Sequence, residues 1–254
     1  LVTAPTFAEY ATALESIGCT VERFFLREQE DFAVTDAFCA AIRPGVDMVF
    51  LCQPNNPTGQ LTTLPLVEQI LRRCAACGTL LVVDECFLDF LPDHALHTAK
   101  GLLGEGDLVI LKAFTKLYGM AGVRLGYALS ADTALLEQMQ ACGQPWGVSS
   151  LAQAAGLAAL EETAYVEKVR ALIAEQRPRL TAGLRALGLW VLDGRANYLL
   201  FQAPETLGEA LRQRGAVLRS CANYPGLGPG WYRTAVRTGP ENEQLLKLLA
   251  EVLE

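Results

Sequence analysis

Lys116 lies in a glycine-punctuated stretch that runs from Lys112 to Leu129, and Arg124 follows it eight residues later. A lysine amine attacks a carbonyl group only when it is neutral, and a nearby cation both discourages its protonation and attracts anions. The pair therefore predicts a lysine that forms a Schiff base with a bound aldehyde, beside an arginine that binds an anionic group. For this stretch taken alone, a surface loop with solvated side chains is the alternative.

Two other polar segments come directly after apolar runs. Asn56 follows the run 48–52, and Asp84 and Glu85 follow the run 79–83. Apolar runs of this length are typical of buried parallel strands, and open α/β sheets bind ligands where such strands end. A carboxylate at that edge can pair with a protonated ring nitrogen and keep the ring an electron sink.

An asparagine, an aspartate, a lysine and an arginine, each after an apolar run, occur in the same order in the fold-type I enzymes that use pyridoxal 5'-phosphate. The whole chain resembles this superfamily of class I and II aminotransferases. Within it the chain is similar to the threonine-phosphate decarboxylases of cobalamin biosynthesis, which are close to the histidinol-phosphate aminotransferases. NPTG indicates only the superfamily, whereas RSCANYPGL is much more specific. The matching segments are APTFAEY, CQPNNPTG, VVDECFLDFLP, LKAFTKLYGMAGVRLGY, QPWGVSSLA, GRANYLL, LRSCANYPGL and WYRTAVR.

The resemblance implies a catalytic pair and a set of cofactor-binding residues. Lys116 would hold the cofactor and carry protons, and Asp84 would pair with the ring nitrogen. Phe7 would stack on the ring, although a plain core phenylalanine is the alternative. The implied cofactor-binding residues are Phe7, Asn56, Asp84, Thr115, Lys116 and Arg124.

The implied substrate-binding residues are Asn56, Arg219 and Arg233. Guanidinium groups suit carboxylate and phosphate because they stay charged and donate two parallel hydrogen bonds. Arg233 would bind the amino acid carboxylate, and Arg219 the phosphate end. Arg237 alternates onto the same strand face as Arg233 and is an alternative, as is a surface position for any of these arginines. Asn197 is expected to shape the pocket wall.

Two positions depart from the superfamily pattern. Ala113 stands where relatives carry a serine or threonine for the cofactor phosphate, and Thr115 is expected to replace part of that contact. Phe87 stands where most aminotransferases carry a tyrosine on the phenolic oxygen of the cofactor, which leaves Asn56 to hold it. A phenylalanine here is compatible with the decarboxylases.

By resemblance, the expected reaction is the decarboxylation of L-threonine O-3-phosphate to 1-amino-2-propanol O-phosphate. The orientation of the α-carbon bonds decides whether carbon dioxide or a proton leaves, so transamination of the histidinol-phosphate type is the alternative. A folded but non-catalytic protein is a further alternative. The resemblance also implies a homodimer, because the family builds each site at a subunit interface.

Composition indicates an ordinary soluble enzyme. The chain has 254 residues, of which 51% are hydrophobic and 19% charged, and a formal charge of -7. The acidic balance and the scattered basic residues exclude a nucleic-acid footprint, and no apolar run approaches the roughly 20 residues that span a bilayer. We therefore expect a cytoplasmic protein without nucleic-acid or membrane partners.

The eight cysteines are too few for a disulfide scaffold, and no metal site is expected. Cys74 and Cys77 form a CxxC pair within a helical pattern, without the second pair or the histidines that a zinc site needs. His94 and His97 lie in a proline-containing connection, for which a loop role is the better interpretation.

Alternating apolar strands and helical patterns predict an α/β fold with a mostly parallel sheet. We expect a large cofactor-binding domain over 1–150, a long connecting helix over 151–187 with Pro178 as a kink or restart, and a small α+β domain over 188–254. The opening residues already predict a strand, so by resemblance an N-terminal segment of the family is expected to be absent. That segment carries a Gly-rich phosphate-binding turn, an aromatic donated across the dimer and part of the small domain.

Overall fold

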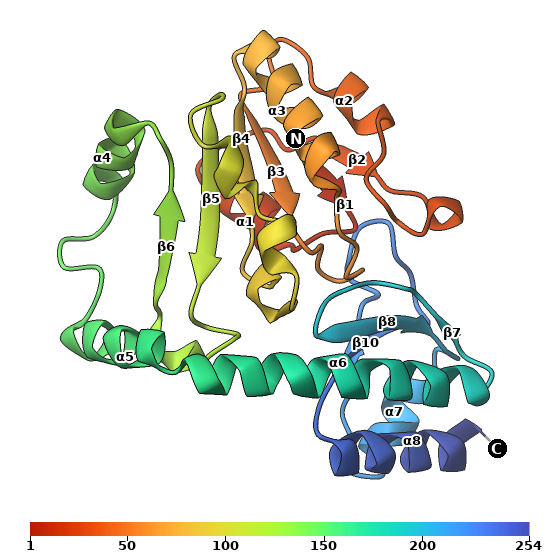
Figure 1. Ribbon diagram of the computed structural model, residues 1–254. Coiled ribbons are helices and arrows are strands. Elements are labelled where there is room, and N and C mark those ends of the chain that lie inside the picture. Colours follow the sequence, from red (N-terminus) through yellow and green to blue (C-terminus); the bar gives the residue numbers. More distant parts are fainter. Residues whose placement is uncertain (254) are drawn as a thin grey trace.

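The computed structural model describes residues 1–253, which form two β-sheets joined by a long helix (Figure 1). The larger sheet has six strands in the order β2-β1-β3-β4-β5-β6, and every pair is parallel except β5 with β6. The α/β class and the mostly parallel sheet are confirmed. Its strands are β1 (Val2–Ala4), β2 (Arg23–Phe25), β3 (Met48–Cys52), β4 (Leu80–Asp84), β5 (Leu108–Ala113) and β6 (Gly126–Leu129).

Helices cover both faces of this sheet because side chains alternate along each strand. Val49 and Leu51 of β3 pack in the main core with α2 and α3, whereas Phe50 and Cys52 face Tyr10 of α1. For the same reason Asp84, the last residue of β4, and Glu85, which follows it, point to opposite faces of the sheet. These helices are α1 (Glu9–Ser16), α2 (Ala37–Ala41) and α3 (Leu64–Cys77).

The smaller sheet is antiparallel, with the strand order β7-β8-β10-β9. One of its faces packs on α6, α7 and α8 through a core that includes Leu180, Phe201 and Leu249. In Figure 1, α6 runs from beneath the larger sheet to the smaller one. The elements are β7 (Trp190–Val191), β8 (Tyr198–Gln202), α7 (Leu207–Arg212), β9 (Arg219–Ser220), β10 (Trp231–Ala235) and α8 (Gly239–Leu253).

The expectation of a single connecting helix over 151–187 is wrong. The chain forms α5 (Ser150–Glu161) and α6 (Thr163–Ala186), separated at Glu162, whose ψ of 51° is not helical. The break lets α5 contact the segment before β6 while α6 continues to α8 and β7. Pro178 lies inside α6 and does not end it. A further helix, α4 (Thr133–Cys142), was not predicted, although Asp132 caps its first turn.

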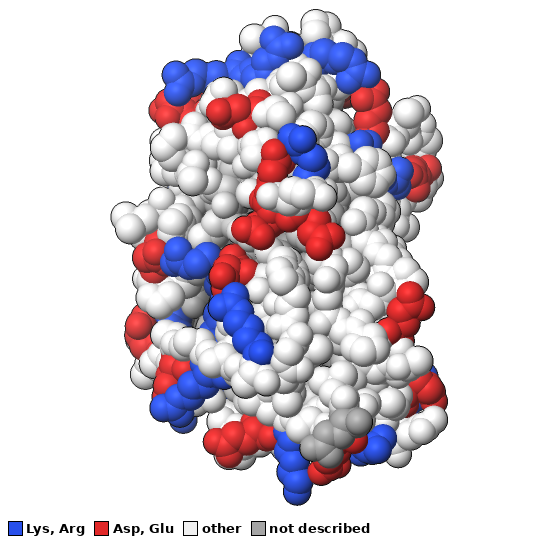
Figure 2. All heavy atoms as spheres, turned by 90° about the vertical axis from the view of Figure 1, so that its right-hand side faces the viewer, with Lys and Arg blue, Asp and Glu red and all other residues white. Residues whose placement is uncertain are grey.

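Charged residues of both signs are interspersed over the face shown in Figure 2, with no large area of one sign. Among residues 1–253, no helix is both long and apolar enough to cross a membrane. The same residues contain no cluster of metal-ligating side chains, and the eight cysteines are free thiols.

Candidate active site

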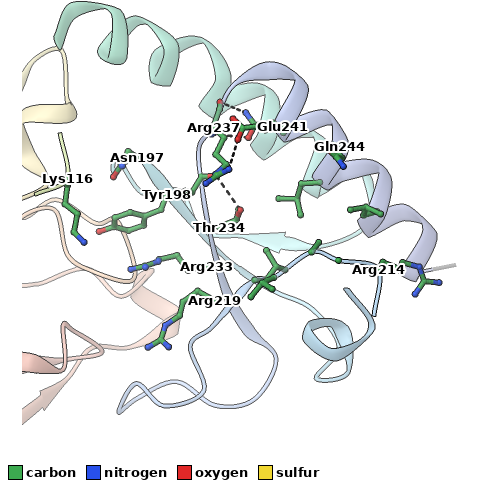
Figure 3. A pocket seen from close by; sticks show the side chains of 18 of the residues that line it. Lys116, Asn197, Tyr198, Arg214, Arg219, Arg233, Thr234, Arg237, Glu241 and Gln244 are labelled. Carbon is green, nitrogen blue, oxygen red and sulfur yellow. Dashed lines mark hydrogen bonds and ion pairs between the residues drawn. The ribbon is translucent and has the colours of Figure 1, made fainter. Parts of the chain in front are cut away.

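A cavity of about 660 Å³ lies where the turn after β5 meets the smaller sheet and α8. Lys116 approaches it from the larger sheet, while Tyr198, Arg219 and Arg233 approach it from the smaller one. Figure 3 shows these four side chains along one side of the cavity. The tertiary structure thus brings together a lysine and two arginines that are about a hundred residues apart in the sequence.

Lys116 is exposed and lies in the turn that follows β5. Its Nζ is 6.0 Å from the ring centroid of Phe87, which packs edge-on against Tyr198 at 5.2 Å between centroids. Within residues 1–253 the ammonium has no carboxylate partner. The Lys116 side chain, which lies over the Phe87 ring, is therefore available to a ligand.

Arg233 and Arg219 are directly opposite each other on β10 and β9. The Arg233 guanidinium carbon lies 5.0 Å from the ring centroid of Tyr198, and its Nη1 donates a short hydrogen bond to Asn56 Oδ1. Arg219 lies 5.6 Å from the ring centroid of Tyr224. Neither arginine has a carboxylate partner within residues 1–253, so both charges are available to an anion.

Arg237, the alternative to Arg233, also lines the cavity, but its charge is paired. Its Nη1 lies 2.5 Å from Glu241 Oε1, and Figure 3 shows the pair beside α8, away from Lys116. Asn197 lines the cavity as expected, and its buried Oδ1 has no hydrogen-bond donor among residues 1–253. The geometry therefore favours Arg233 over Arg237 as the anion-binding group nearer to the lysine.

Asp84 ends β4 on the face that carries α1. Tyr10 Oη donates to its Oδ2 at 2.5 Å, and the Cys86 backbone N–H donates to its Oδ1 at 2.9 Å. Burial, with the neighbouring Cys52 and Asp84, raises the pKa of Tyr10 well above its usual value, so Tyr10 stays a donor. Each carboxylate oxygen keeps one lone pair for a further donor.

Glu85, the neighbouring carboxylate, has a different environment. It is fully buried and accepts hydrogen bonds from Thr98 Oγ1 and the Ala99 backbone. Lys112 Nζ lies 3.1 Å from Glu85 Oε2 and 2.9 Å from Asp89 Oδ1. Although burial opposes it, these two carboxylates raise the pKa of Lys112. The two neighbouring carboxylates therefore differ: Glu85 belongs to a buried ion-pair cluster, whereas Asp84 accepts only from Tyr10 and the Cys86 N–H among residues 1–253.

Phe7 is 38% exposed, and its ring packs edge-on against Tyr10 at 5.5 Å. Tyr10 in turn contacts Asp84, but Phe7 itself does not line the large cavity. Asn56 is buried at the end of β3, where its Oδ1 also accepts from Tyr224 Oη at 3.4 Å. Because Arg233 and Tyr224 occupy the carbonyl oxygen, the amide Nδ2 is the group left for a ligand.

Arg124 and Thr115, which were expected to bind the cofactor, do not line the cavity. Arg124 is exposed, with a left-handed backbone (φ 60°, ψ 56°), and its Nη1 donates to the Ala121 carbonyl at 3.2 Å. Thr115 is half-buried between Phe114 and Lys116. Neither residue lines the cavity, so their assignment to a cofactor phosphate stays a prediction.

Comparison with known proteins gives the family. Residues 1–252 match the model for aminotransferase class I and II. The chain belongs to this family. Its members are enzymes that use pyridoxal phosphate. The chain is 39% identical over 257 residues to a threonine-phosphate decarboxylase of Salmonella typhimurium, which covers all of this chain and 70% of the relative.

Histidinol-phosphate aminotransferases are also similar. The chain is 34% identical to that of Lactiplantibacillus plantarum, over 99% of this chain and 69% of the relative. The crystal structure of the histidinol-phosphate aminotransferase from Clostridium acetobutylicum superposes with a TM-score of 0.93 at 26% identity, covering 99% of this chain and 77% of that one. The fold of this aminotransferase-family chain is therefore that of the fold-type I enzymes.

Three tyrosines at the site were not found from the sequence. Tyr10 contacts Asp84, Tyr198 lies under Arg233, and Tyr224 reaches Asn56. Tyr10 could have been found because it lies in the first turn of α1, three residues after Phe7 in the same matching segment. Tyr198 and Tyr224 carry no such signal, because each meets a partner more than 30 residues away in sequence.

The residues present fit a cofactor with a carbonyl, a basic ring nitrogen and an oxygen that accepts a hydrogen bond. Lys116 supplies an unpaired amine, Asp84 a carboxylate with free lone pairs, and Asn56 a free amide N–H. The exposed ring of Phe7 adds an apolar plane beside Asp84. This set of donors and acceptors corresponds to the aldehyde, the ring nitrogen and the phenolic oxygen of pyridoxal phosphate.

Proposed function

We propose that this aminotransferase-family protein is a pyridoxal-phosphate-dependent decarboxylase that converts L-threonine O-3-phosphate to 1-amino-2-propanol O-phosphate, a step of cobalamin biosynthesis. One observation carries the proposal: Lys116, Arg219 and Arg233 all face one cavity and have no carboxylate partner within residues 1–253. A site with three unneutralised cations suits a substrate with a carboxylate and a phosphate. The similarity to the Salmonella typhimurium decarboxylase supports this substrate.

Lys116 and Asp84 form the proposed catalytic pair. Pyridoxal phosphate, when bound, supplies an electron sink for the bond that breaks at the α-carbon. Asp84 would pair with its ring nitrogen, while Tyr10 and the Cys86 N–H hold the carboxylate in place. Phe7, Asn56, Thr115 and Arg124 would complete the cofactor site. Lys116 Nζ would hold the cofactor and then return a proton to the α-carbon.

Arg233, Arg219 and Asn56 would bind and orient the substrate. Arg233 would bind the α-carboxylate and Arg219 the phosphate, because the two guanidinium groups are neighbours on adjacent strands. Holding both ends of the substrate fixes which bond at the α-carbon lies perpendicular to the cofactor ring. When that bond joins the α-carbon to the carboxylate, carbon dioxide leaves and a proton takes its place.

The test is product analysis by mass spectrometry after mixing the protein with pyridoxal phosphate and L-threonine O-3-phosphate. We expect 1-amino-2-propanol O-phosphate, and none of it in Lys116→Ala. A matched control is Lys100→Ala, since Lys100 is exposed and far from the cavity lining. Binding of the cofactor, with no amino-propanol phosphate formed, would contradict the decarboxylase while leaving the family unaffected.

Transamination of the histidinol-phosphate type is the second candidate. It is favoured by the 34% identity to the Lactiplantibacillus plantarum aminotransferase. Loss of a proton rather than of carbon dioxide at the same α-carbon would use the same lysine. Transfer of the amino group from histidinol phosphate to a 2-oxo acid, without release of carbon dioxide, would select it.

We also propose that the protein acts as a cytoplasmic homodimer. The family resemblance supports this proposal, and size-exclusion chromatography with light scattering tests it. A monomer that is fully active would contradict it. A protein that folds but binds no cofactor would instead support the non-catalytic alternative.

A further inference from the structure

The turn between β7 and β8 packs against the loop that carries Asn56. The Arg195 backbone N–H donates to the Gly59 carbonyl at 2.6 Å. A Cβ atom placed on Gly194 would lie 2.5 Å from the Thr58 carbonyl oxygen and 2.9 Å from Gly59 Cα. Because both neighbours are backbone atoms, they cannot move aside as a side chain would. Only glycine allows this approach.

We name residues 58–60 and 193–195 together the Gly59–Gly194 joint. Gly194 does not have a left-handed backbone, so its requirement for glycine comes from the contact alone. Two further interactions cross the joint or lie next to it. Gln60 Nε2 donates to the Asp193 carbonyl at 3.2 Å, and Arg195 Nη2 lies 2.9 Å from Asp93 Oδ2.

The joint connects the two halves of the proposed substrate site. Asn56 lies three residues before Gly59, in a loop closed by the Gly59 N–H donating to the Asn55 carbonyl at 2.6 Å. Four residues after Gly194, Tyr198 Oη donates to that same carbonyl at 2.9 Å. Tyr198 is the residue paired with Ala235 in the β8–β10 ladder, and its ring lies beneath Arg233.

We propose that the Gly59–Gly194 joint is a positioning device that sets where Arg233 lies relative to Asn56, and so where the substrate carboxylate binds. The proposal rests on the function proposed above for Arg233. Gly194, Gly59 and Arg195 act here as positioning residues, since none of them lines the cavity. Widening the joint moves β8 and β10, with Arg233, away from the 55–60 loop.

Two of the proposed cofactor-binding residues, Lys116 and Asp84, lie outside this joint, whereas Asn56 lies in the loop that the joint holds. Lys116 lies on the turn after β5, and Asp84 ends β4, where it is held by Tyr10 and Cys86. Neither residue contacts the turn 193–195. A displaced joint should therefore weaken substrate binding more than cofactor binding, a difference that general destabilisation would not produce.

Gly194→Ala tests the proposal, with Gly228→Ala as the matched control. Gly228 also lies in the part of the chain that forms the smaller sheet, no atom lies within 4 Å of a Cβ placed on it, and it precedes a proline. Three quantities are measured in the full protein: the NMR signals of the Arg233 guanidinium without cofactor, the visible absorbance on adding pyridoxal phosphate, and the affinity for L-threonine O-3-phosphate.

In Gly194→Ala we expect the Arg233 guanidinium signals to shift and to exchange faster with water. We also expect substrate affinity to fall about tenfold to a hundredfold, because a displacement of about 1 Å has effects of this size. Cofactor affinity, read from the absorbance, should fall by less than substrate affinity. Gly228→Ala should match the wild type in all three measurements. Unchanged Arg233 signals in Gly194→Ala, or equal losses in both variants, would overturn the proposal.

Arg195→Gln provides a second variant if Gly194→Ala does not fold. It removes the ion pair with Asp93 without adding an atom at the close contact, so we expect changes in the same direction and about threefold in affinity, the size of a partly exposed ion pair. An unchanged Arg233 signal in this variant would then overturn the proposal. A wild-type protein that binds neither cofactor nor substrate would contradict the proposed function, whereas the Arg233 signals still report on the joint.

Discussion

Lys112 and Lys116 are four residues apart, and their environments are opposite. Lys112 is 4% exposed and ion-paired with Glu85 and Asp89, whereas Lys116 is exposed, unpaired and faces the cavity. The carboxylates at the end of β4 differ in the same way. Glu85 belongs to the buried cluster, and Asp84 keeps lone pairs for a ligand. Charges that neutralise each other stabilise the fold, and charges without partners are available to bind.

The largest effect expected from this comparison is on activity in Lys116→Ala. Loss of the group that would hold the cofactor and move the proton should lower the rate of product formation by about a thousandfold or more. The free energy of unfolding should stay close to that of the wild type, because Lys116 is exposed and has no ion pair within residues 1–253. Chemical denaturation and product assays measure the two quantities. A large loss of stability in Lys116→Ala would show that Lys116, like Lys112, has a structural role.

Lys112→Met should give the reverse result for stability. It leaves Glu85 buried without its cation, and breaking a buried ion pair costs about 3–5 kcal/mol. Lys112→Arg keeps the charge and should retain most of the stability. Urea denaturation measures both. If Lys112→Met unfolded at the same urea concentration as the wild type, the cluster would have no structural role.

Arg233→Lys should weaken substrate binding and leave folding intact. The substitution removes the planar guanidinium group that donates to Asn56 and, in the proposal, to the substrate carboxylate. Hydrogen bonds to charged groups contribute about 1.5–3 kcal/mol. We expect KM for L-threonine O-3-phosphate to rise about tenfold to a hundredfold. Arg237→Lys is the control, because Arg237 pairs with Glu241. A larger effect from Arg237→Lys would reverse the assignment.

Tyr10→Phe should have a smaller effect. It removes one of the two hydrogen bonds that hold Asp84, and such a bond contributes about 1 kcal/mol. We expect cofactor affinity, measured by titration of the visible absorbance, to fall about fivefold. Tyr165→Phe is the control, since Tyr165 lies on α6 and does not line the cavity. Equal affinities in wild type and Tyr10→Phe would show that the Cys86 N–H suffices.

The smallest expected effect concerns Asp93, whose carboxylate pairs with His97 and Arg195. Although burial opposes them, these partners lower the pKa of Asp93 from 3.8 to about 2. A depressed folded-state pKa gives stability that is present above pH 3.8 and is lost as the pH falls through about 2. In Asp93→Asn, acid unfolding between these values should be less steep. An unchanged acid transition would show that solvent screens the pair.

Several features of the site could be predicted from the sequence because they depend on local order. Apolar runs that end in Asn56, Asp84 or the Lys116 turn indicate parallel strands, and parallel strands deliver the residues that follow them to one edge of the sheet. The alternation of side chains along β4 also implies that Asp84 and Glu85 face opposite sides. The fold class followed from such patterns, and the family from the resemblance of the quoted segments.

The tertiary structure alone decided which charges are neutralised. Lys112 and Lys116 are both lysines in one loop-and-strand segment, and only the positions of Glu85 and Asp89 pair the first and leave the second free. It also decided that Arg233 meets Asn56 while Arg237 meets Glu241, and that Gly194 must be glycine because the Thr58 carbonyl lies against it. Sequence patterns report a residue's own strand or helix, whereas pairing between different elements depends on how those elements pack.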